Sequence, residues 1–442
     1  MNIFRTRLRT SPILALAMVV ALVGFAGEAQ ALVNRASMDV TTRYLLRSHL
    51  SYANGTISTS ETIWVRNVSG AAISKVNLSV MPRAFGELTA ISDFRADGKV
   101  VTAAWTKTSN LEVQLGRDVA HGETAIVTLK FSVRASGTID TSLQGRLSKA
   151  NGIMQVSHWF PIVSNGHDVR YPGDSQVTRT ATKIRLELTT DSSSVRIAAP
   201  GLKLAAPTGY HVYEMDNTRD FAFGASPYYK IASGSAAGVG VVAYYTTGNA
   251  AAALSVAKAA LVTFEAAFGQ YQWPRYVIAQ TGRAGSGNEY PGIIFLGGPM
   301  FSNSEVVAHE TAHQWWYAMA GNDQMMEPWL DEGIAEFAAS YFYGGFHSYS
   351  STRPVNSSIY EFPNVPAPQT SSDPNSYDQT IYFKSASFLN GLRSRMGSSA
   401  FFNGLRAFFA ANRNGVMTTR EFYDTMARYG ASKTYMRQFV SL

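Results

Sequence analysis

The sequence has 442 residues, of which 46% are hydrophobic and 16% charged, as in a folded chain long enough for two or three domains. The formal net charge is +7, without a dense run of Lys or Arg after the N-terminus, so nucleic acid is not expected as a partner. The absence of cysteine excludes disulfides and thiolate metal ligands, which leaves His, Asp, Glu and water to bind any metal.

The first 31 residues have the three parts of a secretory signal peptide. Three early arginines form the positive region, residues 13–25 are apolar, and residues 29–31 form a small-x-small cleavage site. The apolar run is shorter than the roughly 20 residues of a transmembrane helix. We therefore expect export to the periplasm or the extracellular space, with an uncleaved membrane anchor as the alternative. No later segment is expected to span a membrane.

Residues 32–235 are predicted to form an N-terminal domain of antiparallel strands. Short runs rich in Val, Ile, Thr and aromatic residues recur there, and Asn-Gly and Asp-Gly pairs between them are typical turn signals. This pattern favours a β saddle or sandwich. The runs that we assign to strands are residues 62–65, 125–133, 183–189 and 210–215.

Residues 236–442 are predicted to form a second, mainly helical domain, so the fold class is multidomain α+β. We interpret residues 232–240, rich in Gly, Ala and Ser, as the boundary. An Ala-rich helical pattern covers residues 251–268 and ends at Gly269, a favourable C-cap. Beyond it we predict short strands at 275–280 and 292–296, a long loop at 356–377, and helices at 384–396, 400–411 and 419–429.

Residues 309–313 have the sequence His-Glu-Thr-Ala-His. The spacing i, i+4 puts the imidazoles of His309 and His313 on one helix face, where both can reach a Zn²⁺ at about 2.0–2.1 Å. Glu310 points roughly 100° around the helix and could contact a water beside the metal rather than the metal itself. Ser302 and Glu305 predict a capping box at the start of this helix. The alternative is an ordinary helix with two histidines and no metal.

A third protein ligand is needed, because catalytic zinc takes three protein ligands and keeps an open position. Glu332 is the candidate, since residues 314–331 are enough for a turn that brings a second helix back to the first. That second helix is predicted to run to about residue 343, just before Gly344 and Gly345.

The two stretches that carry these residues closely resemble a known family. Residues 306–316 have the sequence Val-Val-Ala-His-Glu-Thr-Ala-His-Gln-Trp-Trp, and residues 329–333 are Trp-Leu-Asp-Glu-Gly. They resemble the membrane alanyl aminopeptidase and leukotriene-hydrolase family of gluzincin zinc metallopeptidases, in which Asn usually stands where this chain has Asp331. The resemblance implies a thermolysin-like catalytic domain that holds one Zn²⁺ per chain through His309, His313 and Glu332, with Glu310 as the base.

Two shorter matches follow the same family order. Residues 287–292, Gly-Asn-Glu-Tyr-Pro-Gly, resemble the family's G-x-M-E-N substrate-binding strand, with Asn288 in place of Met and Tyr290 in place of Asn. This match implies that Glu289 grips the α-amine of the substrate, beside Gly287 and Asn288. Residues 382–385, Tyr-Phe-Lys-Ser, resemble the family's Y-x-K-G segment, which implies that Tyr382 stabilises an oxyanion.

The resemblance implies an aminopeptidase that acts on peptides with a free N-terminus. The chain resembles a compact form without the large C-terminal helical domain of full-length relatives, so a more open site is expected. Two alternatives remain: a gluzincin endopeptidase, if Glu289 does not face the metal, and a non-catalytic zinc-containing binding module.

Glu336 could orient a ligating histidine, but an exposed helix charge is the favoured interpretation. The other histidines are interpreted as structural or surface residues: His49, His121, His158, His167, His211 and His347.

Overall fold

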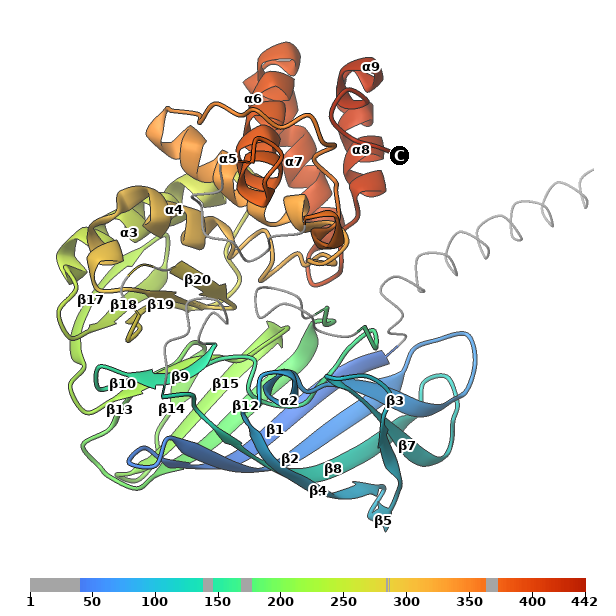
Figure 1. The fold of residues 1–442 in the computed structure, drawn as a ribbon, viewed down its shortest axis with the longest axis vertical. Helices are drawn as coiled ribbons and strands as arrows, with labels where there is room; N and C mark the ends of the chain where they lie inside the picture. The colour runs from blue at the N-terminus through green and yellow to red at the C-terminus, as the bar shows by residue number, and fades with distance from the viewer. Residues whose placement is uncertain (1–39, 138–145, 168–176, 284, 286, 363–372) are drawn as a thin grey trace, which may run out of the picture.

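A computed structural model describes residues 40–137, 146–167, 177–283, 285, 287–362 and 373–442. The predicted signal peptide lies outside the described residues. Figure 1 shows a broad β domain, low in the view, with a mainly helical domain above it. The predicted α+β organisation is therefore confirmed, while the placing of the boundary between residues 235 and 236 stays a prediction.

An eight-stranded sheet forms the base of the β domain. Its central strands, β1 (Val40–Ser51) and β2 (Thr56–Asn67), alternate between buried and exposed side chains, as expected for a sheet with one face against the core. β1 pairs antiparallel with β2 and parallel with β12. All four runs predicted as strands lie in this sheet. Its order is β14 (Leu202–Leu204), β15 (Tyr210–Thr218), β12 (Ala181–Thr190), β1, β2, β8 (Thr124–Arg134), β4 (Leu88–Ala96) and β5 (Lys99–Val100).

Two four-stranded sheets complete the β domain. An aromatic core joins the first of them to the large sheet, because the ring of Trp159 lies 5.9 Å from that of Phe131 on β8 and 5.7 Å from that of Phe223 on β16. The first sheet has the order β13 (Arg196–Ala198), β16 (Phe223–Ser226), β10 (Ile153–Val156) and β9 (Leu147–Ala150). The second has the order β11 (Ile162–Val163), β3 (Ile73–Ser79), β7 (Asn110–Val119) and β6 (Ala103–Trp105), with the short helix α2 (Met81–Ala84) after β3.

A five-stranded sheet begins the second domain. The segment interpreted as the boundary, residues 232–240, lies in the first hairpin of this sheet. Ala237 and Gly238 both have positive φ, 51° and 76°, which suits the two-residue turn that closes a hairpin. The small residues at this position therefore allow a tight turn. The order is β17 (Lys230–Ala236), β18 (Val239–Tyr245), β19 (Arg275–Gln280), β21 (Ile293–Leu296) and β20 (Gly287–Tyr290).

Helix α3 (Ala250–Phe268) is the longest described helix. The side chain of Asn249 accepts a hydrogen bond from the amide of Ala252 at its start, and Gly269 follows its end as predicted. With a mean hydropathy of 1.5 it is long and apolar enough to cross a membrane, judged by length and composition alone. Its length and apolarity differ from what we expected of later segments, while the expectation that none of them spans a membrane stays a prediction. Its buried side chains pack against β17, β18, α4 and α7.

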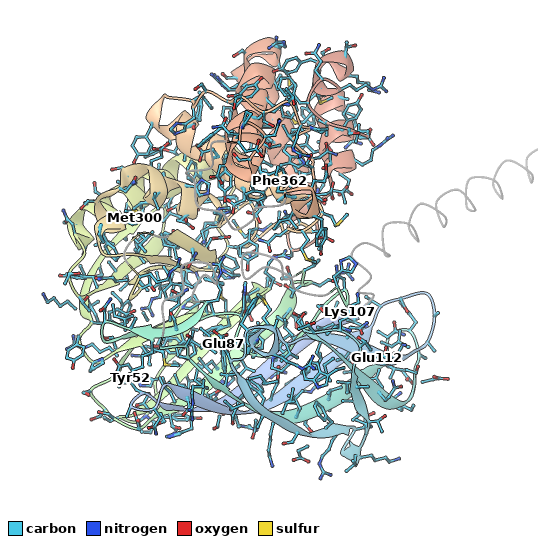
Figure 2. The ribbon with its side chains drawn as sticks, in the orientation of Figure 1. Tyr52, Glu87, Lys107, Glu112, Met300 and Phe362 are labelled. Carbon is cyan, nitrogen blue, oxygen red and sulfur yellow. The ribbon has the colours of Figure 1, made fainter. Side chains whose placement is uncertain are left out.

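The remaining helices agree with the prediction, apart from a short last helix and a π-helical turn that were not predicted. They are α4 (Ser304–Ala312), α5 (Glu332–Tyr343), α6 (Ser385–Met396), α7 (Ser398–Asn412), α8 (Thr419–Arg428) and α9 (Lys433–Met436). Shorter turns of 3₁₀ helix span Pro299–Ser302, Pro328–Leu330 and Ile359–Glu361, and the π-helical turn spans Asp378–Lys384. Figure 2 shows side chains filling the space between these helices, with Met300 and Phe362 labelled.

A buried arginine joins the two domains. The guanidinium of Arg219 donates hydrogen bonds to the carbonyl oxygens of Thr178 at 2.7 Å, Ala318 at 3.2 Å and Gly415 at 2.8 Å. Burial lowers its pKa to about 10, so the group stays charged near neutral pH. Because these carbonyls belong to three separate segments, Arg219 fixes the helical domain against the β domain.

Candidate metal centre

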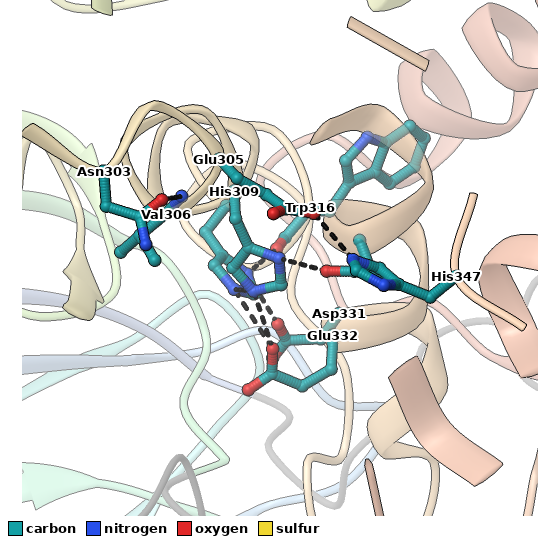
Figure 3. A network of polar contacts seen from close by, with 10 residues as sticks. Asn303, Glu305, Val306, His309, Trp316, Asp331, Glu332 and His347 are labelled. Atoms are coloured by element: carbon teal, nitrogen blue, oxygen red, sulfur yellow. Dashed lines mark hydrogen bonds and ion pairs between the residues drawn. The ribbon is translucent and has the colours of Figure 1, made fainter. Parts of the chain in front are cut away.

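His309, His313 and Glu332 converge on one point, as Figure 3 shows for His309 and Glu332. The Nε2 atoms of the two imidazoles lie 3.1 Å apart, and each lies 3.2 Å from Oε2 of Glu332. Ligands about 2.0–2.1 Å from a tetrahedral zinc ion are separated by about 3.3 Å. The three ligand atoms therefore have almost the spacing of one face of a zinc coordination tetrahedron.

Helix α4 delivers both histidines. It begins after Asn303, whose side chain accepts a hydrogen bond from the amide of Val306 at 3.2 Å. The predicted capping box of Ser302 and Glu305 was wrong, because Ser302 ends a preceding 3₁₀ turn and the adjacent Asn303 takes the capping position. The helix ends at Ala312, so His313 is its C-cap and the chain turns back directly after the second histidine.

Acidic side chains orient both imidazoles from behind. Nδ1 of His309 lies 3.1 Å from Oε2 of Glu336. Nδ1 of His313 lies 2.8 Å from Oδ1 of Asp331 and 3.2 Å from the carbonyl oxygen of Trp316, which accepts its hydrogen bond. An acceptor at Nδ1 holds the proton there and leaves Nε2 to bind a metal. Glu336 is only 6% exposed, so its interpretation as an exposed helix charge was wrong. The role of Asp331 was missed, since only the fold reveals its partner.

The charges of the cluster suit a cation. Burial by itself would lower the pKa of His309, but hydrogen bonds with Glu332 and Glu336 outweigh it and raise the pKa to about 10. Burial would raise the pKa of Glu332, and the facing imidazoles of His313 and His309 lower it instead. The cluster thus stabilises positive charge between its ligand atoms. Two imidazole nitrogens and a carboxylate oxygen are a donor set that fits Zn²⁺.

Glu310 and Gly287 lie against each other. Glu310 is buried on α4, and Gly287 begins strand β20. A Cβ atom added at Gly287 would lie 2.6 Å from Cδ of Glu310, far inside van der Waals contact. Only glycine therefore lets β20 pass this close to the carboxylate, which gives a physical reason for the residue type at position 287.

Glu289 faces the ligand cluster from β20. Its carboxylate is grouped with His313, Asp331 and Glu332, with one ligand atom from each lying within 4.8 Å of the others. Oε1 of Glu289 is buried and has no hydrogen-bond partner in the described part of the chain. Burial raises the pKa of Glu289 to about 7, against the lowering effect of His313. Its neighbour Asn288 accepts a weaker hydrogen bond, 3.4 Å long, from Nε2 of Gln155 on β10.

Gln314 ties β20 to the end of α4. Its side-chain amide donates to the carbonyl oxygen of Tyr290 at 3.1 Å and accepts from the amide of Gly292 at 2.8 Å. Tyr290 in turn accepts a hydrogen bond at its hydroxyl from Arg146, at 3.1 Å, and so connects to the β domain. Gln314 was not predicted, because an amide beside a metal-binding histidine has no characteristic spacing in a sequence.

Tyr382 lies on the π-helical turn and packs beside the cluster. Its ring is stacked on that of His309, with a centroid distance of 5.8 Å and an interplanar angle of 18°. Burial, together with the negative charge of Glu332, raises the pKa of Tyr382 well above its usual value, so the hydroxyl keeps its proton. Tyr377 and Phe362 continue this aromatic row away from the metal ligands.

The structure thus brings the predicted site residues onto four elements that contact in turn: β20 with α4, α4 with α5, and α5 with the π-helical turn. Their roles stay predictions. A comparison with protein families matches residues 300–441 to the peptidase family M1 domain. These residues form an M1 domain. The match includes the three ligands His309, His313 and Glu332, together with Glu310 and Tyr382. It begins after Glu289 on β20.

Known proteins resemble this chain to different extents. Human endoplasmic reticulum aminopeptidase 1 is 26% identical over 135 residues, a match that covers 27% of this chain and only 14% of the human protein. An M1 zinc metallopeptidase from Deinococcus radiodurans has a similar fold, with a TM-score of 0.68 and 18% identity over 91% of this chain and 93% of that one. A mutant of that enzyme bound to a Tyr-Ser-Ala substrate has a TM-score of 0.67, with 18% identity over 91% and 94% of the two chains. The M1 domain and the β domain therefore share a two-domain fold with these structures.

Proposed function

We propose that this chain is a zinc-dependent aminopeptidase that hydrolyses the N-terminal residue from peptides. The observation that carries the proposal is the ligand triangle of His309, His313 and Glu332, with Glu310 and Glu289 buried beside it. An isolated structural zinc site needs neither of the two additional carboxylates. Their presence favours catalysis over a non-catalytic binding module.

The triangle would hold one Zn²⁺ per chain. When bound, the ion supplies a Lewis acid that polarises the scissile carbonyl and makes a water molecule more acidic. Glu336 holds the Nδ1 proton of His309 away from the ion, and the carbonyl oxygen of Trp316, with Asp331 beside it, does the same for His313. These contacts also fix the orientation of both rings.

Two further side chains handle protons and charge. The carboxylate of Glu310 takes the proton of the attacking water and later delivers it to the leaving amine. Tyr382 is held as a neutral phenol, so it can donate a hydrogen bond to the oxygen that becomes negative in the transition state. Glycine at position 287 lets β20 lie against Glu310 with no side chain of that residue between the strand and the carboxylate.

Glu289 gives the exopeptidase specificity. Its buried carboxylate faces the ligand cluster and can pair with the ammonium group of a peptide N-terminus. This placement favours an aminopeptidase over an endopeptidase, for which a free amine is not required. The Tyr-Ser-Ala substrate in the similar Deinococcus structure supports a peptide as the ligand class.

Paired substrates test this proposal. The purified chain with Zn²⁺ is expected to hydrolyse an amino-acid amide with a free amine, and to lose most of this activity when the amine is acetylated. Glu289→Gln should raise KM for the free-amine substrate and reduce the difference between the two substrates. Glu112→Gln on β7 removes a carboxylate paired with Lys75 far from the site and serves as a control. Equal rates on free and acetylated substrates would exclude the aminopeptidase assignment.

Export of the protein is part of the same proposal. The charged, apolar and small-residue segments at the N-terminus support translocation, followed by cleavage after residue 31. N-terminal sequencing of the mature protein from fractionated cells tests this. A start at the initiator methionine in the membrane fraction would favour the uncleaved anchor instead.

A further inference from the structure

A second group of metal-binding side chains lies behind the candidate metal centre. It consists of Glu305 in the first turn of α4, Glu336 on α5 and His347 after α5, with one ligand atom from each within 4.8 Å of the others. Nε2 of His347 lies 2.8 Å from Oε1 of Glu305 and 3.9 Å from Oε1 of Glu336. Figure 3 shows His347 beside Glu305, on the side of His309 away from Glu332.

Glu336 anchors this outer group. Its side chain is 8% exposed, and its Oε2 is directed at Nδ1 of His309. The other oxygen, Oε1, makes no hydrogen bond within the described residues, and its nearest ionic partner is His347 at 3.9 Å. One oxygen of a largely buried side chain therefore faces the outer group, and its nearest ionic partner there is His347 at 3.9 Å.

The outer group is open to solvent. A surface hollow of about 770 Å³ is lined by Asn303, Glu305, Tyr343 and His347, among others. The side chains of Glu305 and His347 are each 48% exposed, so both can change rotamer without disturbing the core. An ion could thus enter from solvent while the buried Glu336 stays in place.

We propose that Glu305, Glu336 and His347 bind a second divalent transition-metal ion, with Zn²⁺ as the best fit. One imidazole nitrogen and two carboxylate oxygens are a donor set that zinc accepts. Ligands about 2.0–2.2 Å from one ion lie roughly 3–4 Å apart, and the observed separations of 2.8 and 3.9 Å need only small movements of the exposed side chains to reach this range. Because two of its ligands are exposed and must be ordered on binding, this outer ion binds more weakly than the ion of the inner triangle.

The shared carboxylate of Glu336 couples the two sites. One oxygen would bind the outer ion while the other accepts the Nδ1 proton of His309, a ligand of the inner site. A dication on Oε1 withdraws negative charge from Oε2 and so weakens the support of His309. Binding of the outer ion does not depend on the proposed peptidase activity, whereas its effect on hydrolysis, inhibition by excess zinc, rests on that function.

Counting metal ions in the full chain tests the proposal without any substrate. Equilibrium dialysis against rising free Zn²⁺, followed by elemental analysis, should give about one ion per chain and then, at higher concentration, about two. The double variant Glu305→Gln/His347→Ala should keep the first phase and weaken the second by at least about tenfold. His49→Ala removes an exposed histidine of β1 in the other domain and should keep both phases. The absence of cysteine removes thiolate binding as a complication.

Two results would overturn the site. The wild-type chain could bind only about one ion at every concentration, or the double variant could retain the second phase unchanged while circular dichroism shows it to be folded. In an activity assay, excess Zn²⁺ should inhibit the wild type and His49→Ala at concentrations at least about tenfold lower than the double variant. A second bound ion without inhibition would refute the coupling through Glu336, and a chain inactive at every zinc concentration would refute the proposed function while leaving the metal count intact.

Discussion

Each domain buries a glutamate, one in a strand and the other in a helix, and the two side chains have opposite surroundings. Glu61 on β2 is 1% exposed, and neither of its oxygens has a hydrogen-bond partner among the described residues. Burial raises its pKa well above the usual value. Glu332 at the start of α5 is also buried, yet the imidazoles of His309 and His313 lower its pKa. Burial alone keeps a carboxyl neutral, and only facing imidazoles make it an anion able to bind a metal.

The contrast extends beyond one residue in each domain. In the helical domain four further acids, Asp331, Glu289, Glu310 and Glu336, lie close to the same two histidines. In the β domain the described ion pairs are mostly at the surface, such as Arg117 with Asp97 and Glu123. Surface pairs of this kind contribute little free energy. Buried charged side chains are therefore concentrated around the two histidines of the helical domain, which distinguishes it from the β domain.

The largest effect is expected from neutralising an acid in the cluster. Glu310→Gln keeps the shape of the side chain but removes the base, so kcat should fall by about 10²–10⁴-fold. Zinc content should stay the same, because Glu310 is not part of the ligand triangle. The matched change Glu61→Gln should leave kcat unaltered. Turnover retained by Glu310→Gln would remove the base from the mechanism.

A large effect on stability is expected at the boundary between the two regions. Arg219→Met leaves the carbonyls of Thr178, Ala318 and Gly415 buried without their charged donor, which should destabilise the chain by about 2–5 kcal/mol. Thermal unfolding of the full chain measures this loss. Arg406, which donates to the carbonyls of Ala266 and Ala267 nearer the surface, provides the matched control Arg406→Met. Equal losses for both variants would contradict the role of burial.

An intermediate effect is expected from the acids behind the imidazoles. Glu336→Gln can still accept the proton of His309 but lacks the charge, so zinc affinity of the inner triangle should fall by about 10–100-fold. Asp331→Asn should lower the zinc affinity less, since it introduces the residue that the similar family usually has. Competition with a chelator at low free zinc gives both affinities. Unchanged affinity for Glu336→Gln would show that hydrogen bonding, not charge, orients His309.

The effect on function is smallest at Glu61, where we expect only a dependence of stability on pH. The folded chain keeps the Glu61 proton at pH values where the unfolded chain has lost it, so stability is lost as pH rises above about 4.5 towards the raised pKa. Each pH unit in that window costs about 1.4 kcal/mol. Glu61→Gln should remove this slope when unfolding is measured at several pH values. An identical slope in the variant would assign it to other groups.

The sequence was most informative where chemistry and local periodicity coincide. His309 and His313 follow from helical spacing, and Glu332 follows from the number of ligands that zinc requires together with the family resemblance. The amphipathic strands and the helices after residue 384 were likewise predictable, because their apolar periods are local.

Other features depend on contacts between distant segments. Glu336 looked like a surface charge, since nothing in its own helix shows that His309 packs above it. The hairpin at residues 232–240 was not predicted, because its run of small residues carries no alternation of apolar and polar side chains. The π-helical turn that carries Tyr382 has no sequence signature of its own, and it forms where the chain packs against α5.

The amide of Gln314 has a consequence for which bond is cut. By holding the turn after β20 to the end of α4, it makes the carboxylate of Glu289 and the imidazole of His313 parts of one rigid body. The distance between the Glu289 carboxylate and the His313 imidazole is therefore fixed. Under the proposed function, a substrate whose amine pairs with Glu289 would place its first peptide bond at the metal ligands, and the substrate would lose one residue at a time.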